Sequence, residues 1–144
     1  KKTIPKIEFE GRVQFIKGKL SNNQKNKILI DGCHSDASTK NLAKYLKKFK
    51  TPIYGIWGSL KNKNPDQLIK NFKGIFKEII TIKIPNESNA MSAFDLRKIA
   101  EKNGFKAIES DGIKNSIKKF SRKEKKIIVI FGSLYLAGHA LSLN

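Results

Sequence analysis

The chain has 144 residues, of which 39% are hydrophobic, and a mean hydropathy of −0.43. These values fit one globular domain with its own hydrophobic core. No stretch approaches the roughly 18 consecutive apolar residues that a membrane span needs, and the charged N-terminal residues lack the apolar segment of a signal peptide. The single cysteine, Cys33, excludes an intramolecular disulfide, so we expect a cytoplasmic protein without a membrane partner.

The formal net charge of +18 is the most unusual feature of the composition. Such an excess is typical of proteins that bind nucleic acid. Only three of the 30 basic residues are arginines (Arg12, Arg97 and Arg122), whereas sites that read bases or hold phosphates favour arginine. The lysines are interspersed with Asn and Ile, as in A/T-rich coding sequences. We interpret the charge as a solvated surface and expect no nucleic-acid partner. A basic nucleic-acid-binding module, or attraction of anionic ligands, is the alternative.

Apolar, β-branched runs predict strands along the chain. Several of them are continuously apolar, which is typical of strands that are covered on both faces. The predicted strands span residues 12–17, 27–31, 53–57, 78–83, 105–109 and 127–131.

Amphipathic windows between these runs predict helices. Residues 36–48 have an apolar face at helical spacing, formed by Leu42, Tyr45, Leu46 and Phe49. Asn64 and Pro65 predict the start of a second helix, with an apolar stripe of Leu68, Phe72, Ile75 and Phe76. Ser92 and Asp95 resemble a capping box, and Gly104 predicts the end of that helix. Two further helical windows cover residues 112–121 and 133–143.

This alternation of strands and helices predicts an α/β fold. We expect one three-layer, Rossmann-like domain over residues 1–144, with a mostly parallel six-stranded sheet and helices on both faces. No crossover helix follows the first strand, which makes it the candidate antiparallel member. In such sheets ligands bind at the carboxyl ends of the strands. Polar or glycine-rich segments follow three predicted strands there, at residues 31–35, 55–59 and 132–133.

Four short motifs resemble one enzyme family in their order and spacing. They are GRVQ (11–14), IDGCHS (30–35), GSLKNKN (58–64) and FGSLYLAGHAL (131–141). The chain resembles the C-terminal domain of folylpolyglutamate synthase/dihydrofolate synthase, within the Mur-type ligases, from Gly11 to Leu141. The resemblance implies an ATP-dependent ligase that adds L-glutamate to dihydropteroate or reduced folates through an acyl phosphate.

The resemblance also implies roles for individual residues. Arg12 and Asp31 would bind ATP, the arginine at a phosphate and the aspartate at ribose hydroxyls or at a cation. His34 and Ser133 would lie near the incoming glutamate and the acyl phosphate. The loops that support these contacts would contain Gly11, Gly32, Ser35, Gly58 and Gly132. None of these residues is assigned as a certain catalytic group.

The sequence departs from the family pattern at several positions. Cys33 replaces an alanine, and Ser35 replaces an asparagine, which puts one hydrogen bond of the motif in doubt. Asn62 and Asn64 stand where aspartates are often seen, so no role is carried over to them. The 144 residues also contain no phosphate-loop motif and no obvious acidic cluster for Mg²⁺. The resemblance implies that both lie in an N-terminal phosphate-loop domain, so we expect that domain to be the partner that supplies the Mg²⁺ ligands, and this chain alone to be inactive.

Each assignment has a plainer structural alternative. Asp31 can be a turn residue or a helix cap, Arg12 an exposed strand residue, and Ser133 the N-cap of the last helix. Cys33 has no base at a spacing that would activate it, and we do not assign it as a nucleophile. For the whole chain, the alternatives are a peptidoglycan-precursor ligase, the basic nucleic-acid-binding module, or a degenerate domain that retains only the fold.

Overall fold

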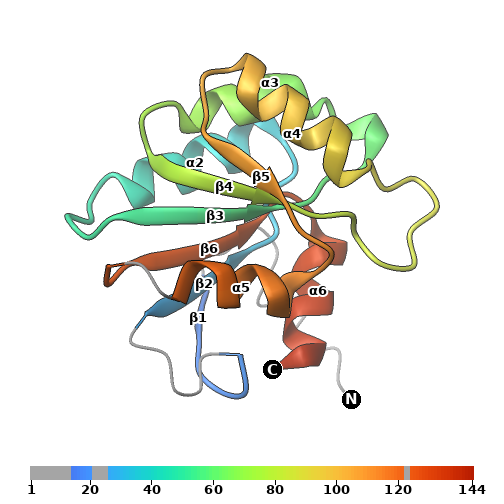
Figure 1. The fold of residues 1–144 in the computed structure, drawn as a ribbon. Helices are drawn as coiled ribbons and strands as arrows, with labels where there is room; N and C mark the ends of the chain where they lie inside the picture. The colour runs from blue at the N-terminus through green and yellow to red at the C-terminus, as the bar shows by residue number, and fades with distance from the viewer. Residues whose placement is uncertain (1–13, 21–25, 122–123) are drawn as a thin grey trace.

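The computed structural model describes residues 14–20, 26–121 and 124–144. Within these ranges six strands form one sheet in the spatial order β1-β2-β6-β3-β4-β5 (Figure 1). The bounds are β1 Gln14–Ile16, β2 Lys27–Asp31, β3 Ile53–Trp57, β4 Phe76–Thr81, β5 Ala107–Glu109 and β6 Ile127–Phe131. β1 pairs antiparallel with β2, and the remaining neighbours pair in parallel. The sheet predicted from the sequence is therefore confirmed, including its antiparallel member.

The continuous apolar runs became strands because both of their faces are covered. In β6, for example, every residue from Ile127 to Phe131 is buried. The helices are α2 Asp36–Leu46, α3 Pro65–Ile69, α4 Ala93–Lys102, α5 Ile113–Ser121 and α6 Leu134–Leu143, with short 3-10 helices η1 Lys61–Lys63 and η2 Lys70–Phe72. Helices α2, α3 and α4 cover one face of the sheet, and α5 and α6 cover the other (Figure 1). None of the helices in the described ranges is long and apolar enough to cross a membrane.

The alternation of side chains along each strand divides the core into two layers. In β2, Leu29 belongs to the core layer under α2, α3 and α4, and Ile28 and Ile30 belong to the layer under α5 and α6. The two layers hold the central strands rigidly, since burial of each large apolar side chain contributes about 1.5–3 kcal/mol. The sheet therefore holds the ends of the loops at its edges in fixed positions.

The predicted second helix is partly wrong. It ends at Ile69 and continues only as the short helix η2, while Phe76 is the first residue of β4. Gly74 has a φ of +80°, which only glycine adopts readily, and this turn stops the helix before Phe76. Phe72 and Phe76 are four positions apart, as on one face of a helix. Their rings do pack together, with centroids 5.3 Å apart, but they do so across the turn. Strand β4 accordingly begins two residues before its predicted start.

The order of the strands creates a switch point beside β6. The chain leaves β2 toward the face of α2, and it leaves the neighbouring β6 toward the opposite face, where α6 lies. Loops that follow adjacent strands therefore diverge at the carboxyl edge between β2 and β6. In open α/β sheets this divergence is where ligands bind.

Candidate functional site

The three polar or glycine-rich loops predicted at one edge of the sheet lie next to one another. The register pairs Asp31 of β2 with Phe131 of β6, and Phe131 with Trp57 of β3. Each strand is followed at once by a glycine: Gly32, Gly132 and Gly58. We call this set of loops the carboxyl-edge site. The parallel pairing thus confirms the adjacency of the loops that was expected from the sequence.

Close packing requires glycine at Gly132 and favours it at Gly32. Gly132 has a φ of +119°, and a Cβ there would overlap the carbonyl oxygen of Gly58 and lie 2.7 Å from Trp57 Cδ1. A Cβ on Gly32 would lie 2.5 Å from Leu134 Cδ2, at the start of α6. The two glycines therefore let the three loops and the first turn of α6 approach one another at backbone distance.

Asp31 lies under these loops and is 1% exposed. Its Oδ1 accepts a hydrogen bond from the Cys33 backbone N–H at 2.8 Å, which closes the turn after β2. Burial raises the pKa of the Asp31 carboxyl to about 6, although the bonds from Cys33 oppose the shift. The same burial, together with the charge of Asp31, raises the pKa of the Cys33 thiol well above its usual value. The structure thus gives Asp31 the turn role described above, and it makes Cys33 a poor nucleophile.

His34 is half-buried at the rim of the site. Its Nδ1 lies 3.0 Å from the carbonyl oxygen of Gly32. When Nδ1 carries the ring proton it donates to that carbonyl, and Nε2 is then left as an acceptor. The His34 backbone N–H donates to Ser38 Oγ at 3.0 Å, so both the ring and the backbone are oriented by neighbours within the loop and the first helical turn.

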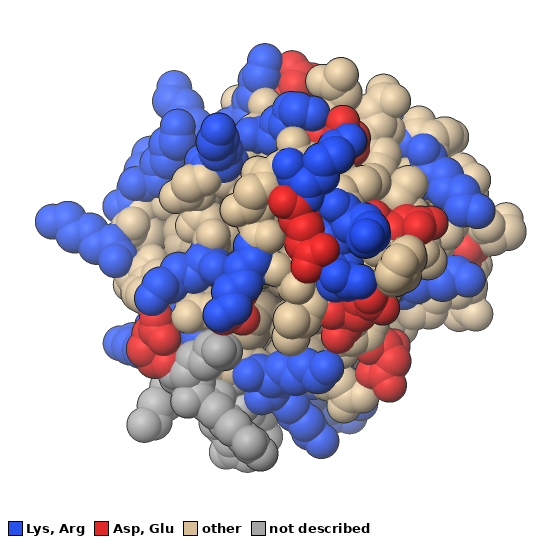
Figure 2. Space-filling view, turned by 45° about the horizontal axis from the view of Figure 1, so that its top comes forward, with Lys and Arg blue, Asp and Glu red and all other residues tan. Residues whose placement is uncertain are grey.

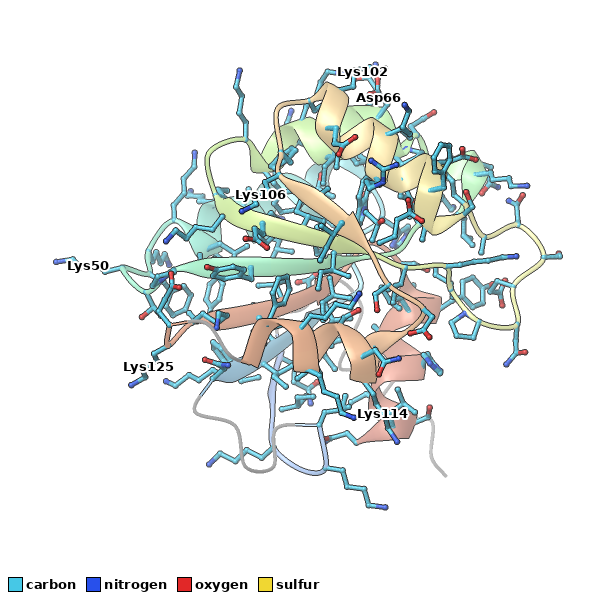
Figure 3. The ribbon with its side chains drawn as sticks, viewed as in Figure 1. Lys50, Asp66, Lys102, Lys106, Lys114 and Lys125 are labelled. Carbon is cyan, nitrogen blue, oxygen red and sulfur yellow. The ribbon has the colours of Figure 1, made fainter. Side chains whose placement is uncertain are left out.

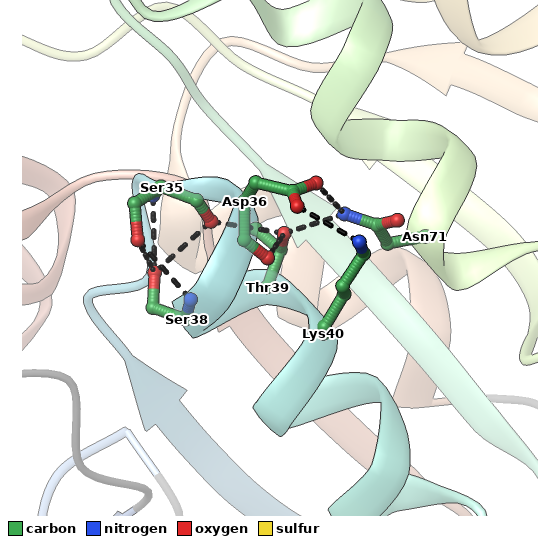
Figure 4. Close-up of polar contacts among 6 residues, drawn as sticks. All are labelled: Ser35, Asp36, Ser38, Thr39, Lys40 and Asn71. Atoms are coloured by element: carbon green, nitrogen blue, oxygen red, sulfur yellow. Dashed lines mark hydrogen bonds and ion pairs between the residues drawn. The ribbon is translucent and has the colours of Figure 1, made fainter.

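Ser35 begins helix α2 through a reciprocal capping box with Ser38 (Figure 4). The Ser38 N–H donates to Ser35 Oγ at 3.1 Å, and the Ser35 N–H donates to Ser38 Oγ at 3.0 Å. The hydroxyl that replaces the family's asparagine is therefore used to cap the helix. This pair was missed in the sequence, because the usual capping box has Glu or Gln three residues after the cap.

Asn71, from the short helix η2, ties the first turn of α2 to the neighbouring segment (Figure 4). Its Nδ2 donates to Thr39 Oγ1 at 2.7 Å and to Asp36 Oδ1 at 3.1 Å. Asp36 also forms an ion pair with Lys40 at 2.9 Å, and its pKa is lowered, chiefly by the hydrogen bond from Lys40. No pattern in the sequence pointed to Asn71, since the contact spans more than thirty positions and depends on how α2 packs against η2.

Ser133 is the N-cap of α6, as its alternative assignment predicted. Its Oγ accepts from the Tyr135 N–H at 3.0 Å, and the residue is 3% exposed. Helices α2 and α6 therefore both begin at the carboxyl-edge site. Helix N-termini carry partial positive charge and unpaired N–H groups, so this edge favours a negatively charged ligand.

The remaining residues at and near this edge are placed as follows. Trp57 is buried and stacks on Phe131, while Tyr135 is 56% exposed on the first turn of α6. A small, largely apolar hollow beside the loops is lined by Cys33, Thr39, Trp57, Ser59, Phe131 and Gly132, among others. Gly11 and Arg12 lie outside the described residues. Within the described ranges no group of three His, Cys, Asp or Glu side chains could hold a metal ion.

The fold defines the class as a three-layer, Rossmann-like α/β domain, whose candidate ligand site is at the switch point of its sheet. The family follows from comparison of the sequence. A family model described as "Dihydrofolate synthetase, C-terminal domain" matches residues 13–143. The chain therefore belongs to this family of dihydrofolate synthetase C-terminal domains, as the motif resemblance had indicated. A search of curated proteins finds no match.

Several solved structures with the same fold are folylpolyglutamate synthases. Folylpolyglutamate synthase from Thermotoga maritima has a TM-score of 0.73 and 21% identity, over 92% of this chain and 30% of that one. The Mycobacterium tuberculosis folylpolyglutamate synthase, complexed with ADP and AMPPCP, has a TM-score of 0.72 and 19% identity, over 89% of this chain and 32% of that one. The bifunctional folylpolyglutamate synthase/dihydrofolate synthase of Yersinia pestis, complexed with AMPPNP and Mn ion, has a TM-score of 0.75 and 15% identity, over 92% of this chain and 30% of that one. The chain thus spans about a third of the length of each.

Proposed function

We propose that this chain is the C-terminal domain of an ATP-dependent ligase that adds L-glutamate to dihydropteroate, to reduced folates or to both. ATP would phosphorylate the acceptor carboxylate, and the amine of glutamate would then attack the acyl phosphate and release phosphate. The observation that carries the proposal is the meeting of three glycine loops and two helix N-termini at one edge, in a member of the dihydrofolate synthetase family.

In this proposal Arg12 and Asp31 contact the nucleotide. The guanidinium of Arg12 would neutralise charge on a phosphate, for which its fork of donors is suited. A carboxylate repels phosphate, so we place Asp31 at a ribose hydroxyl or at a bound cation. Because Asp31 is buried and also holds the Cys33 N–H, it would fix the shape of the loop as well as meet the ligand.

His34 and Ser133 are proposed to receive glutamate beside the acyl phosphate. With Nδ1 directed to the Gly32 carbonyl, His34 presents Nε2 as an acceptor for the ammonium or amine of glutamate. Ser133 lies at the first turn of α6, where backbone N–H groups favour the negative charge of the acyl phosphate or of the glutamate carboxylates. Gly32, Gly58 and Gly132 keep the loops close enough for both contacts.

The reaction also needs parts that these 144 residues do not contain. We propose that a phosphate loop and the Mg²⁺ ligands lie in an N-terminal domain, which would pack over the carboxyl-edge site. Bound Mg²⁺ would neutralise the charge on the phosphates during transfer. This chain alone would then be inactive. We assign the enzyme to the cytoplasm, where the free, buried thiol of Cys33 stays reduced.

The test uses this chain joined to a phosphate-loop domain of the family. It measures the phosphate that this protein releases from ATP in the presence of Mg²⁺. Release should require both glutamate and a pteroate or folate, and His34→Ala should lower it at least about tenfold. His139→Ala, at the other histidine, is the matched control and should leave the rate unchanged. Release only with a muramyl precursor would select the peptidoglycan ligase, and no release with any acceptor would select the degenerate domain.

A further inference from the structure

The edge of the sheet opposite the carboxyl-edge site carries a row of exposed lysines. One of these lysines lies at the start of each parallel strand, either as its first residue or up to three residues before it. In the spatial order β2, β6, β3, β4, β5 these are Lys27, Lys125, Lys50, Lys73 and Lys106. We call these five residues the amino-edge row. Because neighbouring strands lie about 4.8 Å apart, the row extends over about 19 Å.

Most of this positive charge is not neutralised. Lys50, Lys73 and Lys125 have no carboxylate within ion-pair distance in the part of the chain that the structure describes. Lys106 pairs with Glu78 at 3.1 Å, and Lys27 lies over the ring of Phe15. Lys50 and Lys125 project outward from the side where β3 and β6 begin (Figure 3), and blue side chains are more abundant than red ones on that side of the molecule (Figure 2). Glu124, next to Lys125 in the sequence, forms an ion pair with Lys77 at 2.9 Å.

Helix dipoles do not account for the row. Helices α2 and α4 end at this edge, and Lys44 and Lys102 in their last turns offset the negative ends of those helices. The five lysines of the amino-edge row lie outside helices, at strand starts and in the loops before them. The helix-dipole effect falls off within the last turn, so it gives no reason for lysine at these positions.

We propose that the amino-edge row binds the phosphate backbone of a nucleic-acid duplex, independently of base sequence. This proposal reverses the expectation from composition that there is no nucleic-acid partner. Arginine is favoured for bidentate contacts and for reading bases, but lysine also binds phosphates as a point charge. The absence of arginine from the row therefore excludes base reading rather than contact with the backbone. A single strand would need aromatic platforms for stacking, but the rings of Phe15, Tyr45 and Phe49 are packed edge to face with one another. A duplex presents about one charge per 1.7 Å of axis, so several lysines along the row can meet phosphates together.

A membrane surface is the less favoured partner. Binding to anionic lipid is strengthened by apolar side chains that insert beside the basic residues. Three of the five exposed large apolar residues in the described ranges, Phe94, Leu134 and Tyr135, lie in the first turns of α4 and α6, at the opposite edge of the sheet. The other two are Ile108 in β5 and Phe15, whose ring lies under Lys27. The amino-edge row therefore combines five charges with one partly exposed ring, that of Phe15, which makes charge the larger contribution to binding. In the sequence its lysines look scattered, and only the strand order brings them into line.

The test is the fluorescence anisotropy of labelled DNA and RNA duplexes of about 20 base pairs, titrated with the 144-residue chain from about 50 to 200 mM salt. We expect log K to fall against log salt with a slope of about −3 to −4. The triple variant K50Q/K73Q/K125Q should bind at least about tenfold more weakly at low salt, with a slope shallower by about 2–3. The matched control K61Q/K83Q/K114Q removes the same charge from exposed lysines toward the carboxyl edge and should lose less than about twofold.

The proposal fails if no duplex is bound at low salt, or if both triple variants lose affinity equally. It also fails if vesicles with phosphatidylserine, or a polyglutamate peptide, bind more tightly than either duplex. Those results would assign the row to a membrane or to an acidic peptide. Comparing the DNA and RNA arms identifies which duplex is preferred. Thermal unfolding of both variants should show that each is folded.

Discussion

Asp31 is buried at the end of a central strand and lies beside the candidate ligand site. Burial raises its pKa from 3.8 to about 6. The folded state therefore binds this proton more tightly than the unfolded state does. The resulting stabilisation is complete below about pH 4 and is lost as the pH rises through about 6. A shift of about 2 units corresponds to roughly 3 kcal/mol.

The variant Asp31→Asn removes this titration but keeps an oxygen that can accept from the Cys33 N–H. We expect Asp31→Asn to be more stable than the original chain at pH 7, by up to about 3 kcal/mol, with the difference shrinking toward pH 4. Urea unfolding of both proteins across this range measures the difference. Parallel curves with a constant offset would contradict the raised pKa.

Gly132 tests how closely the loops of the site are packed. Gly132→Ala combines a positive φ with overlap against Gly58 and Trp57, so we expect a loss of about 3 kcal/mol or more in unfolding free energy. Gly138→Ala is the control, because a Cβ at that position in α6 has nothing within 4 Å. It should stabilise the helix by about 0.5–1 kcal/mol. Equal effects in the two variants, measured by urea unfolding, would show that the loops are not in backbone contact.

At the scale of elements, helix caps decide where α2 and α6 begin at the site. Ser35→Ala removes the acceptor for the Ser38 N–H and should cost about 1 kcal/mol in unfolding free energy. Ser88→Ala is the control: this exposed loop serine forms no side-chain hydrogen bond with the other described residues and should change stability by less than about 0.5 kcal/mol. Thermal unfolding compares the two, and a loss no larger for Ser35→Ala would argue against the capping box.

The sequence was most informative where an element has a local cause. The strand 127–131 was predicted in full because a buried parallel strand reads as an unbroken apolar run, and Ser133 was predicted as a cap because it directly precedes a helical window. Prediction failed around Phe76, where the spacing of four from Phe72 comes from a turn at Gly74 rather than from a helix. Ring packing across that turn is a tertiary contact that no short window contains.

At the scale of the whole molecule, the order of the strands supplies what the sequence could not. The insertion of β6 between β2 and β3 brings Ser133 beside the loop of Asp31 and His34, although about a hundred residues separate them. The motifs therefore indicated which residues belong to a site, but only the sheet places them at one edge. The Asn71 contact and the amino-edge row depend on the same long-range arrangement.

Repulsion among the lysines should also be measurable as a dependence of stability on salt. With a net charge of +18, added salt screens repulsion in the folded chain, so we expect Tm to rise between about 50 and 500 mM NaCl. The variant K50Q/K73Q/K125Q should have a higher Tm at low salt and a weaker salt dependence. A Tm that is flat or falls with salt in the original chain would contradict a repulsive amino edge.

The central claim, that ligands bind at the carboxyl edge, is tested most directly by amide NMR of the chain titrated with a non-hydrolysable ATP analogue and then with glutamate. We expect chemical-shift changes in residues 31–35, 58–59 and 132–135, and little change around Lys50 and Lys73. Changes confined to the amino edge, or no changes at millimolar ligand, would contradict the assignment of the three glycine loops as the ligand site.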